Sequence, residues 1–279
     1  MIVIGRSYVH QYENASRSPP ALVPAYGERG LSGWSSPIGS DSAVPYTSDE
    51  EMRMKRSIGR SRIERFILIS SSEVYGTAES DPMTEDHPLN PRSPYAGTKA
   101  GGDRLAYSYF CTYDLPITII RPFNNYGPYQ HPEKVIPRFI IQALTDRPLT
   151  IHGNGLASRD WLHVFDTAEA ITAACEVPLD AIVGETINVA TGVDESVEEI
   201  ADAILSILGK PASLKHHITD RPGQVDRHIG STDRARDLLG WRSSIPFADG
   251  LERTVRWYRD NPDWWQSVMA TEETAQTVV

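Results

Sequence analysis

The chain has 279 residues, of which 40% are hydrophobic, so it is long enough for one large α/β domain or for a domain with a smaller lobe. Its net charge is -10, which argues against nucleic-acid binding as the main task, because that binding mode uses excess Lys and Arg. No apolar stretch approaches the roughly 20 residues that span a bilayer, and Met1–Gly5 is too short for a signal-peptide core. The two cysteines, Cys111 and Cys175, indicate neither a disulfide framework nor a metal site. We therefore expect a cytoplasmic protein without a membrane or nucleic-acid partner and without a metal.

Residues 1–50 are rich in Pro, Gly and Ser, which is typical of irregular structure, although Met1–Gly5 could form a short strand. After residue 50, short apolar runs alternate with helical patterns. The runs predict strands at 65–70, 117–121, 149–152, 160–164 and 185–189. The helical patterns predict helices at 51–58, 93–113, 135–143, 166–176, 196–208, 233–239 and 247–261.

This alternation favours an α/β fold with a doubly wound parallel sheet. We expect 51–175 to form a partial, Rossmann-like catalytic region. Residues 176–265, interleaved with 125–160, are expected to form mainly a smaller C-terminal α/β lobe that binds substrate, and 266–279 a flexible tail.

Tyr95 and Lys99 stand four residues apart on a predicted helix, so they lie one turn from each other on the same face. An ammonium near a phenol favours the phenolate, which makes Tyr95 a candidate general base. Taken alone, the pair is more often a surface helix pair. Upstream, a predicted buried strand runs directly into Ser71, Ser72 and Glu73, and the carboxyl ends of parallel strands are where such sheets bind ligands. Ser71 could hydrogen-bond the oxygen that Tyr95 deprotonates, and Glu73 offers a second carboxylate.

Four segments in this order carry a resemblance: Ser70-Ser-Ser-Glu-Val-Tyr-Gly76, Pro94-Tyr-Ala-Gly-Thr-Lys99, Arg121-Pro-Phe-Asn-Asn-Tyr-Gly-Pro128 and Arg159-Asp-Trp-Leu-His-Val164. Together they resemble the sugar-nucleotide epimerase/dehydratase branch of the extended short-chain dehydrogenases, and most of all the dTDP-glucose 4,6-dehydratase group. The resemblance covers about 200 residues, from Arg65 to Trp265. It implies an NAD-dependent enzyme that oxidises C4 of a dTDP- or UDP-linked hexose by transient hydride transfer, and a homodimer.

The resemblance also implies a role for each matching position. Tyr95 would be the base, Lys99 its ribose-binding partner, Ser71 the active-site hydroxyl and Glu73 the base at C5. Tyr95, Lys99 and Asn125 would contact NAD. The substrate-binding residues would be Ser72, Asn124, Lys134, Val135, Thr150, Ile151, His152, Arg159, Asn188 and Arg221.

Two departures from the family pattern keep alternatives open. Ser72 stands where dTDP-glucose dehydratases carry an acidic Asp, and a Ser-Glu pair is more similar to UDP-glucuronate decarboxylases, so decarboxylase-like or 4-epimerase activity is an alternative. The family begins with a strand, a Gly-x-x-Gly-x-x-Gly turn and a helix that hold the NAD pyrophosphate. Here Gly27, Gly30 and Gly33 lie in Pro- and Ser-rich sequence with no strand before them and no amphipathic helix after them. A further alternative is therefore an N-terminally truncated, inactive homologue that acts as a binding or dimerisation partner.

Overall fold

The computed structural model describes residues 2–5, 63–220 and 227–276, and the side chains of 63–220 and 227–271. The predicted helix at 51–58, most of the segment 1–50 and Arg221 lie outside these residues. Ile2–Gly5 forms the short strand β1, as the sequence suggested. From Arg65 onward the chain forms one compact unit. Within the described residues, no helix has the length and apolar character needed to cross a membrane.

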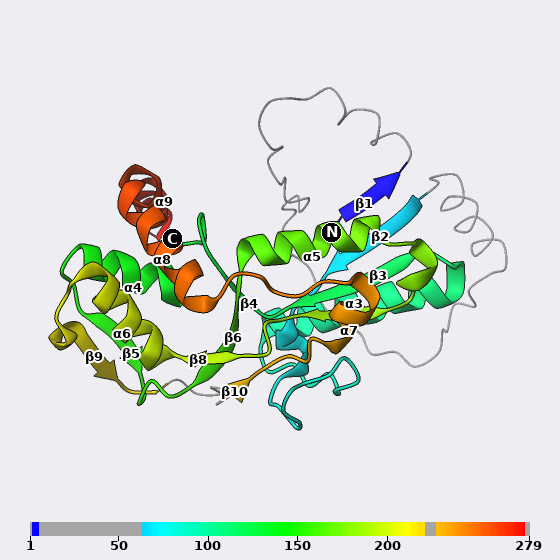
Figure 1. The fold of residues 1–279 in the computed structure, drawn as a ribbon, viewed down its shortest axis with the longest axis horizontal. Coiled ribbons are helices and arrows are strands. Elements are labelled where there is room, and N and C mark those ends of the chain that lie inside the picture. The colour runs from blue at the N-terminus through cyan, green and yellow to red at the C-terminus, as the bar shows by residue number, and fades with distance from the viewer. Residues whose placement is uncertain (1, 6–62, 221–226, 277–279) are drawn as a thin grey trace, which may run out of the picture. The chain divides into compact units, whose positions relative to one another are not determined.

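A parallel sheet is built from the buried apolar runs of the sequence (Figure 1). Strand β2 (Ile63–Ile69) pairs in parallel with β3 (Ile117–Pro122), and β3 pairs in parallel with β7 (Thr186–Val189). Every residue of β3 is buried, as expected of a strand covered on both faces. The predicted parallel α/β fold is confirmed.

Helices cover both faces of this sheet. On one face, Ile120 packs in a cluster with α5 (Val164–Glu176) and α7 (Asp233–Leu239). On the other face, the next residue, Arg121, reaches Asp103 on α3 (Pro94–Tyr113). Successive strand residues point to opposite faces, so the sheet is wound on both sides.

Short strands extend the chain beyond the main sheet. Strand β4 (Asn124–Tyr126) pairs in parallel with β6 (Ser158–His163), which also pairs with β8 (Asp194–Ser196) and β10 (Arg227–His228). Strand β5 (Leu149–His152) pairs in parallel with β9 (Lys215–Ile218). The described residues also include the 3-10 turns η1 (Ser72–Tyr75), η2 (Leu179–Ala181) and η3 (Ala212–Leu214).

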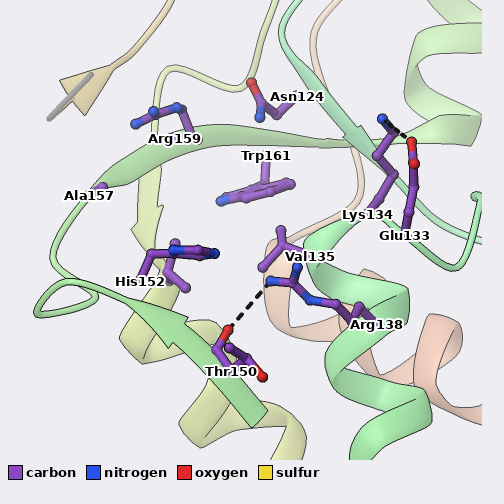
Figure 2. A pocket seen from close by; sticks show the side chains of 11 residues that line it. Asn124, Glu133, Lys134, Val135, Arg138, Thr150, His152, Ala157, Arg159 and Trp161 are labelled. Atoms are coloured by element: carbon purple, nitrogen blue, oxygen red, sulfur yellow. Dashed lines mark hydrogen bonds and ion pairs between the residues drawn. The ribbon is translucent and has the colours of Figure 1, made fainter. Parts of the chain in front are cut away.

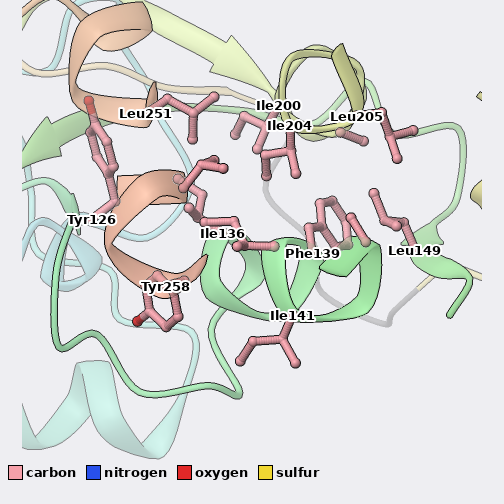
Figure 3. Close-up of a cluster of buried hydrophobic side chains, with 14 of the residues drawn as sticks. Tyr126, Ile136, Phe139, Ile141, Leu149, Ile200, Ile204, Leu205, Leu251 and Tyr258 are labelled. Atoms are coloured by element: carbon pink, nitrogen blue, oxygen red, sulfur yellow. The ribbon is translucent and has the colours of Figure 1, made fainter. Parts of the chain in front are cut away.

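A second hydrophobic core lies among α4 (Val135–Leu144), β5, α6 (Val197–Leu208), α8 (Phe247–Asp260) and α9 (Pro262–Gln276). Figure 3 shows Ile136 and Phe139 of α4 facing Ile200 and Ile204 of α6, and all four are fully buried. Helix α6 begins with a capping box between Ser196 and Glu199 and ends at Gly209. Helix α9 extends to Gln276, so residues 266–276 of the segment expected to be a flexible tail are helical.

Candidate active site and cationic cavity

The segment that follows β2 forms the short helix η1, which carries Glu73. The side chain of Ser71 accepts a hydrogen bond from the backbone N–H of Glu73 at 3.3 Å and so caps this helix. Val74 and Tyr75 are fully buried beneath it. Gly76 ends the helix with φ +70, and a Cβ at this position would lie 1.9 Å from the backbone oxygen of Asn90. The segment therefore needs glycine at position 76, and it holds Ser71 and Glu73 at the carboxyl end of β2.

Tyr95 and Lys99 lie on the first two turns of α3, which Ser93 caps by accepting a hydrogen bond from the N–H of Ala96. The Tyr95 side chain is 58% exposed. The Lys99 ammonium lies 6.0 Å from the centroid of the Tyr95 ring and donates a hydrogen bond to the backbone oxygen of Ile69 at 3.1 Å. Lys99 therefore lies at the end of β2, next to the segment that carries Ser71.

Helix α3 and η1 pack directly against each other. Ala100, which follows Lys99, shares a buried cluster with Val74 and Tyr75, which follow Glu73. The Ser71–Glu73 and Tyr95–Lys99 motifs are thereby brought to one edge of the sheet. The exposed phenol of Tyr95 and the half-buried Glu73 leave both groups accessible to a ligand.

A cavity of about 400 Å³ lies between α4, β5 and β6. Figure 2 shows side chains from these elements facing a common space: Arg159 and Trp161 from β6, Thr150 and His152 from β5, and Val135 and Arg138 from α4. Its lining residues are Asn124, Glu133, Lys134, Val135, Arg138, Thr150, His152, Ala157, Arg159, Trp161 and Val197. Six of them are predicted substrate-binding residues: Asn124, Lys134, Val135, Thr150, His152 and Arg159.

The charges around this cavity favour an anion. Lys134, Arg138 and Arg159 contribute three cations, against the single carboxylate of Glu133, which pairs with Lys134 at 2.7 Å. Arg159 donates through Nη1 to the backbone oxygen of Ser158 at 2.7 Å, and Arg138 donates through Nη2 to the oxygen of Thr150 at 3.4 Å. These bonds orient the guanidinium groups, whose forked donors suit phosphate oxygens.

The other walls of the cavity are apolar. Trp161 presents its indole from β6, and its Nε1 donates to the backbone oxygen of Glu195 at 3.2 Å, which fixes the ring. Val135 and Val197 lie at the starts of α4 and α6. A volume of this size, with apolar walls and a few directed cations, suits a small organic ligand that carries phosphate.

Some predicted site residues lie elsewhere. Ile151 is fully buried in the core of the C-terminal helices, because it alternates with the cavity-lining Thr150 and His152 along β5. Asn188 is also fully buried and does not line the cavity. It accepts a hydrogen bond from the Tyr75 hydroxyl at 2.6 Å and donates to the backbone oxygen of Met83 at 3.1 Å, which is a structural role.

Ser72 and Asn125 form hydrogen bonds to other residues of the chain. Ser72 is 1% exposed, and its backbone hydrogen-bonds His228, a buried residue whose pKa is lowered to about 4 by burial and by the nearby Arg159. The Asn125 side chain accepts a hydrogen bond from the Thr167 hydroxyl and donates to the oxygen of Phe123 at 3.2 Å.

Five cavity residues were not predicted: Glu133, Arg138, Ala157, Trp161 and Val197. Two had a signal in the sequence. Arg138 stands four residues after Lys134, and Trp161 stands two after Arg159, which places it on the same face of a strand. In the part of the chain that the structure describes, no cluster of three or more His, Cys, Asp or Glu side chains could hold a metal ion.

Comparison with known proteins supports the family resemblance that the sequence motifs carry. A family model for GDP-mannose 4,6 dehydratase matches residues 52–254. A dTDP-glucose 4,6-dehydratase from Streptomyces niveus is 39% identical over 214 residues, which is 77% of this chain and 63% of the relative. One from Xanthomonas campestris is 40% identical over 215 residues, covering 74% and 60% of the two chains. The chain thus spans about 63% of the length of the first of these curated relatives.

Solved structures agree with the sequence comparisons. A dTDP-glucose 4,6-dehydratase from Bacillus anthracis, in complex with NAD, is 33% identical with a TM-score of 0.71, and the match covers 78% of this chain and 69% of that one. A UDP-glucuronic acid 4-epimerase from Bacillus cereus, in complex with UDP-glucuronic acid and NAD, is 32% identical with a TM-score of 0.70, covering 75% and 66%. By fold, motif order and sequence, the chain belongs to the GDP-mannose 4,6 dehydratase family of extended short-chain dehydrogenases.

Proposed function

We propose that this protein is an NAD-dependent enzyme of the nucleotide-sugar dehydratase/epimerase type, which oxidises C4 of a dTDP- or UDP-linked hexose. The observation that carries the proposal is that one unit contains both the cationic cavity and the packing of α3, which carries Tyr95 and Lys99, against η1, which carries Glu73. The relatives and structural neighbours that act on dTDP- and UDP-sugars support it.

In this proposal the cavity binds the nucleotide diphosphate. Arg159 and Arg138 bind the phosphate oxygens, because their guanidinium groups are already oriented by backbone carbonyls. Trp161, Val135 and Val197 supply the apolar walls for the remainder of the nucleotide. Asn124 hydrogen-bonds the sugar end. It lies on β4, which begins two residues after the last residue of β3 in the main sheet.

The residues at the end of β2 fit the nicotinamide riboside part of NAD. The Lys99 ammonium has three donors, and the bond to Ile69 uses one of them, so others can bind ribose hydroxyls. Tyr95 and Asn125 are the further proposed contacts on this side. When bound, NAD supplies the hydride acceptor for C4 and returns the hydride at the end of the cycle.

The protein's own groups move the protons. Tyr95 removes the proton of the C4 hydroxyl, assisted by the Lys99 ammonium, and Ser71 hydrogen-bonds the same oxygen. Once C4 is a ketone, the C5 proton becomes acidic. Glu73 takes this proton and then gives it to the C6 hydroxyl as the C6–O bond breaks, so that water leaves. This elimination would make the enzyme a lyase.

Turnover of dTDP-glucose and UDP-glucose with added NAD tests the proposal. Tyr95→Phe should abolish turnover while nucleotide binding to the cavity persists, because only the hydroxyl is lost. Tyr107→Phe is the matched control, since Tyr107 is an exposed tyrosine on the same helix, 53% exposed against 58% for Tyr95. Substantial activity in the Tyr95 variant would remove Tyr95 from the mechanism.

Glu73→Gln separates the two chemical steps. The variant should still oxidise C4 but stall before elimination, which would appear as persistent NADH absorbance in the enzyme. If water were still released at the normal rate, another group would be the base at C5.

Product analysis decides among the reactions of this branch. Ser72 is fully buried beside His228 and supplies no carboxyl group for the departing hydroxyl, and a UDP-glucuronic acid 4-epimerase is among the structural neighbours. Release of a 4-keto-6-deoxy sugar would identify a dehydratase, whereas inversion at C4 without loss of water would identify a 4-epimerase, and carbon dioxide release a decarboxylase.

We further propose that the enzyme works as a cytoplasmic homodimer in which α3 contributes to the interface. Leu105 on α3 is 60% exposed, which supports a role for this helix in association. Sedimentation of the purified protein, compared with a Leu105→Glu variant, tests the dimer.

We also propose that residues 176–265, with 125–160, act mainly as the substrate-binding lobe.

A further inference from the structure

A single buried guanidinium connects the two elements that carry the proposed proton-transfer residues. Arg121, near the end of β3, is 5% exposed. Its Nε donates to Oδ2 of Asp103 at 2.9 Å, and its Nη1 donates to the hydroxyl of Tyr75 at 2.9 Å. The guanidinium also lies over the Tyr75 ring, 4.9 Å from the centroid.

Both partners stand close to proposed catalytic residues along the chain. Asp103 is on α3, four residues after Lys99, which is itself four residues after Tyr95, so the three side chains occupy successive turns of one helix. Tyr75 ends η1, two residues after Glu73. Arg121 therefore fixes the Tyr95 and Lys99 helix relative to the Glu73 helix.

Beyond Tyr75, the hydrogen bonds continue to Asn188 on β7 and to Glu85. The Tyr75 hydroxyl donates to Oδ1 of Asn188 at 2.6 Å, and the Asn188 backbone N–H donates to Oε1 of Glu85 at 2.8 Å. Asn188 lies directly opposite Arg121 in the pairing of β3 with β7. Burial raises the pKa of Tyr75 to about 12, so its hydroxyl keeps the proton that it donates.

Stability alone gives a weak reason for such a network. Asp103 is 2% exposed and Tyr75 and Asn188 are fully buried, and a buried ion pair is often no more stabilising than apolar side chains of similar volume. What the ion pair provides is a defined direction and distance between three elements.

We propose that Arg121, together with Asp103, Tyr75 and Asn188, is a positioning network that sets the distance between Tyr95 on α3 and Glu73 on η1 during turnover. The catalytic assignment of Tyr95 and Glu73 rests on the proposed function, whereas the mechanical link between α3 and η1 does not. The network touches neither substrate nor cofactor, and it acts through the backbone positions of the two helices.

Tyr75→Phe tests the network with a small change, because it removes only the hydroxyl that joins Arg121 to Asn188. A misplacement of reacting groups by about 1 Å can cost on the order of 100-fold in rate. We expect kcat to fall by roughly 10- to 100-fold with KM for the nucleotide sugar unchanged, since the cavity lies on other elements. Hydrogen–deuterium exchange should also become faster in residues 94–100.

Thr118→Val is the matched control. Thr118 lies on the same strand, is fully buried, and donates a hydrogen bond to the backbone oxygen of Ile182 at 2.7 Å, so the variant loses one buried bond away from η1. It should leave both kcat and the exchange of residues 94–100 unchanged.

If Tyr75→Phe does not fold, Asp103→Asn is the second variant in which kcat and exchange are measured. It keeps an acceptor for Arg121 and should retain more activity than Asp103→Ala.

The outcomes separate this inference from the proposed function. A wild-type protein that turns over no nucleotide sugar would overturn the proposed function, and the exchange of residues 94–100 would then decide the link on its own. Unchanged exchange in Tyr75→Phe would overturn the network. Equal effects of Tyr75→Phe and Thr118→Val, or a rise in KM that matches the fall in kcat, would reduce it to ordinary structural support.

Discussion

Arg159 should contribute a large share of the affinity for a nucleotide diphosphate. The residues that line the cavity include three cations, Lys134, Arg138 and Arg159, and one carboxylate, Glu133, which pairs with Lys134 at 2.7 Å. Hydrogen bonds to charged groups contribute about 1.5–3 kcal/mol each. Since about 1.4 kcal/mol corresponds to a factor of ten, Arg159→Gln should weaken binding of UDP or dTDP by roughly 10- to 100-fold.

Calorimetric titration at fixed ionic strength measures this effect, because salt screens exposed charges. Arg159→Lys should lose less, up to about tenfold, since it keeps the charge but not the forked donors. Arg256→Gln is the control: Arg256 is exposed on α8 and pairs with Glu252 at 2.8 Å, away from the cavity. Wild-type affinity in Arg159→Gln, or an equal loss in the Arg256 variant, would refute the assignment of the cavity to the diphosphate.

Three further predictions concern stability. Asp166 is fully buried and accepts hydrogen bonds from the backbone N–H and hydroxyl of Ser244, so Asp166→Ala should lower the free energy of unfolding in urea by about 2–4 kcal/mol, and no loss would contradict this role. The pKa of His228 is about 4 in the fold, against about 6.5 when unfolded, so the unfolded chain binds a proton first as the pH falls. The free energy of unfolding is therefore unaffected by this residue above about pH 6.5 and decreases by about 3 kcal/mol as the pH drops toward 4. His228→Phe should therefore lose less stability than the wild type between about pH 7 and about pH 5, and equal acid sensitivity would exclude this residue as a cause. Gly76→Ala should lower the thermal midpoint, with a loss of at least about 2 kcal/mol, because its Cβ would meet the backbone oxygen of Asn90 at 1.9 Å; an unchanged midpoint would mean that the turn can move.

Elements with strong local signals were predictable from the sequence. The buried strand β3 is an unbroken apolar run, and α6 carries both its capping residues and its terminal glycine. By contrast, β4, β9 and β10 are short and largely polar, with sequences such as Asn-Asn-Tyr and Lys-His-His-Ile. Such strands exist because a partner strand pairs with them, and that partner is distant in the sequence.

The same distinction applies to the site. Lys134 and Arg159 were predicted from the resemblance to a known family, and the structure places both at the cavity. Val197 was missed because it reaches the cavity only through the packing of α6 against β5. The resemblance also implied Asn188, which lies under η1, and only tertiary structure shows that its amide is already hydrogen-bonded there.

The segment from Arg121 to Asn124 connects the two places to which the proposed function assigns roles. Arg121 lies near the end of β3 and hydrogen-bonds Asp103 on α3 and Tyr75 on η1. Asn124, three residues later, pairs with Trp161 on β6 and lines the cavity. Between them, Phe123 is 2% exposed and packs against Val74 and Tyr75 beneath the Glu73 segment. Three residues span at most about 10 Å, so only a short, buried length of chain separates Arg121 of the network from Asn124 of the cavity. The proposed function requires a ligand with a charged end for the cavity and a reactive end for Tyr95 and Glu73, and a hexose joined to a nucleotide through a diphosphate has that construction.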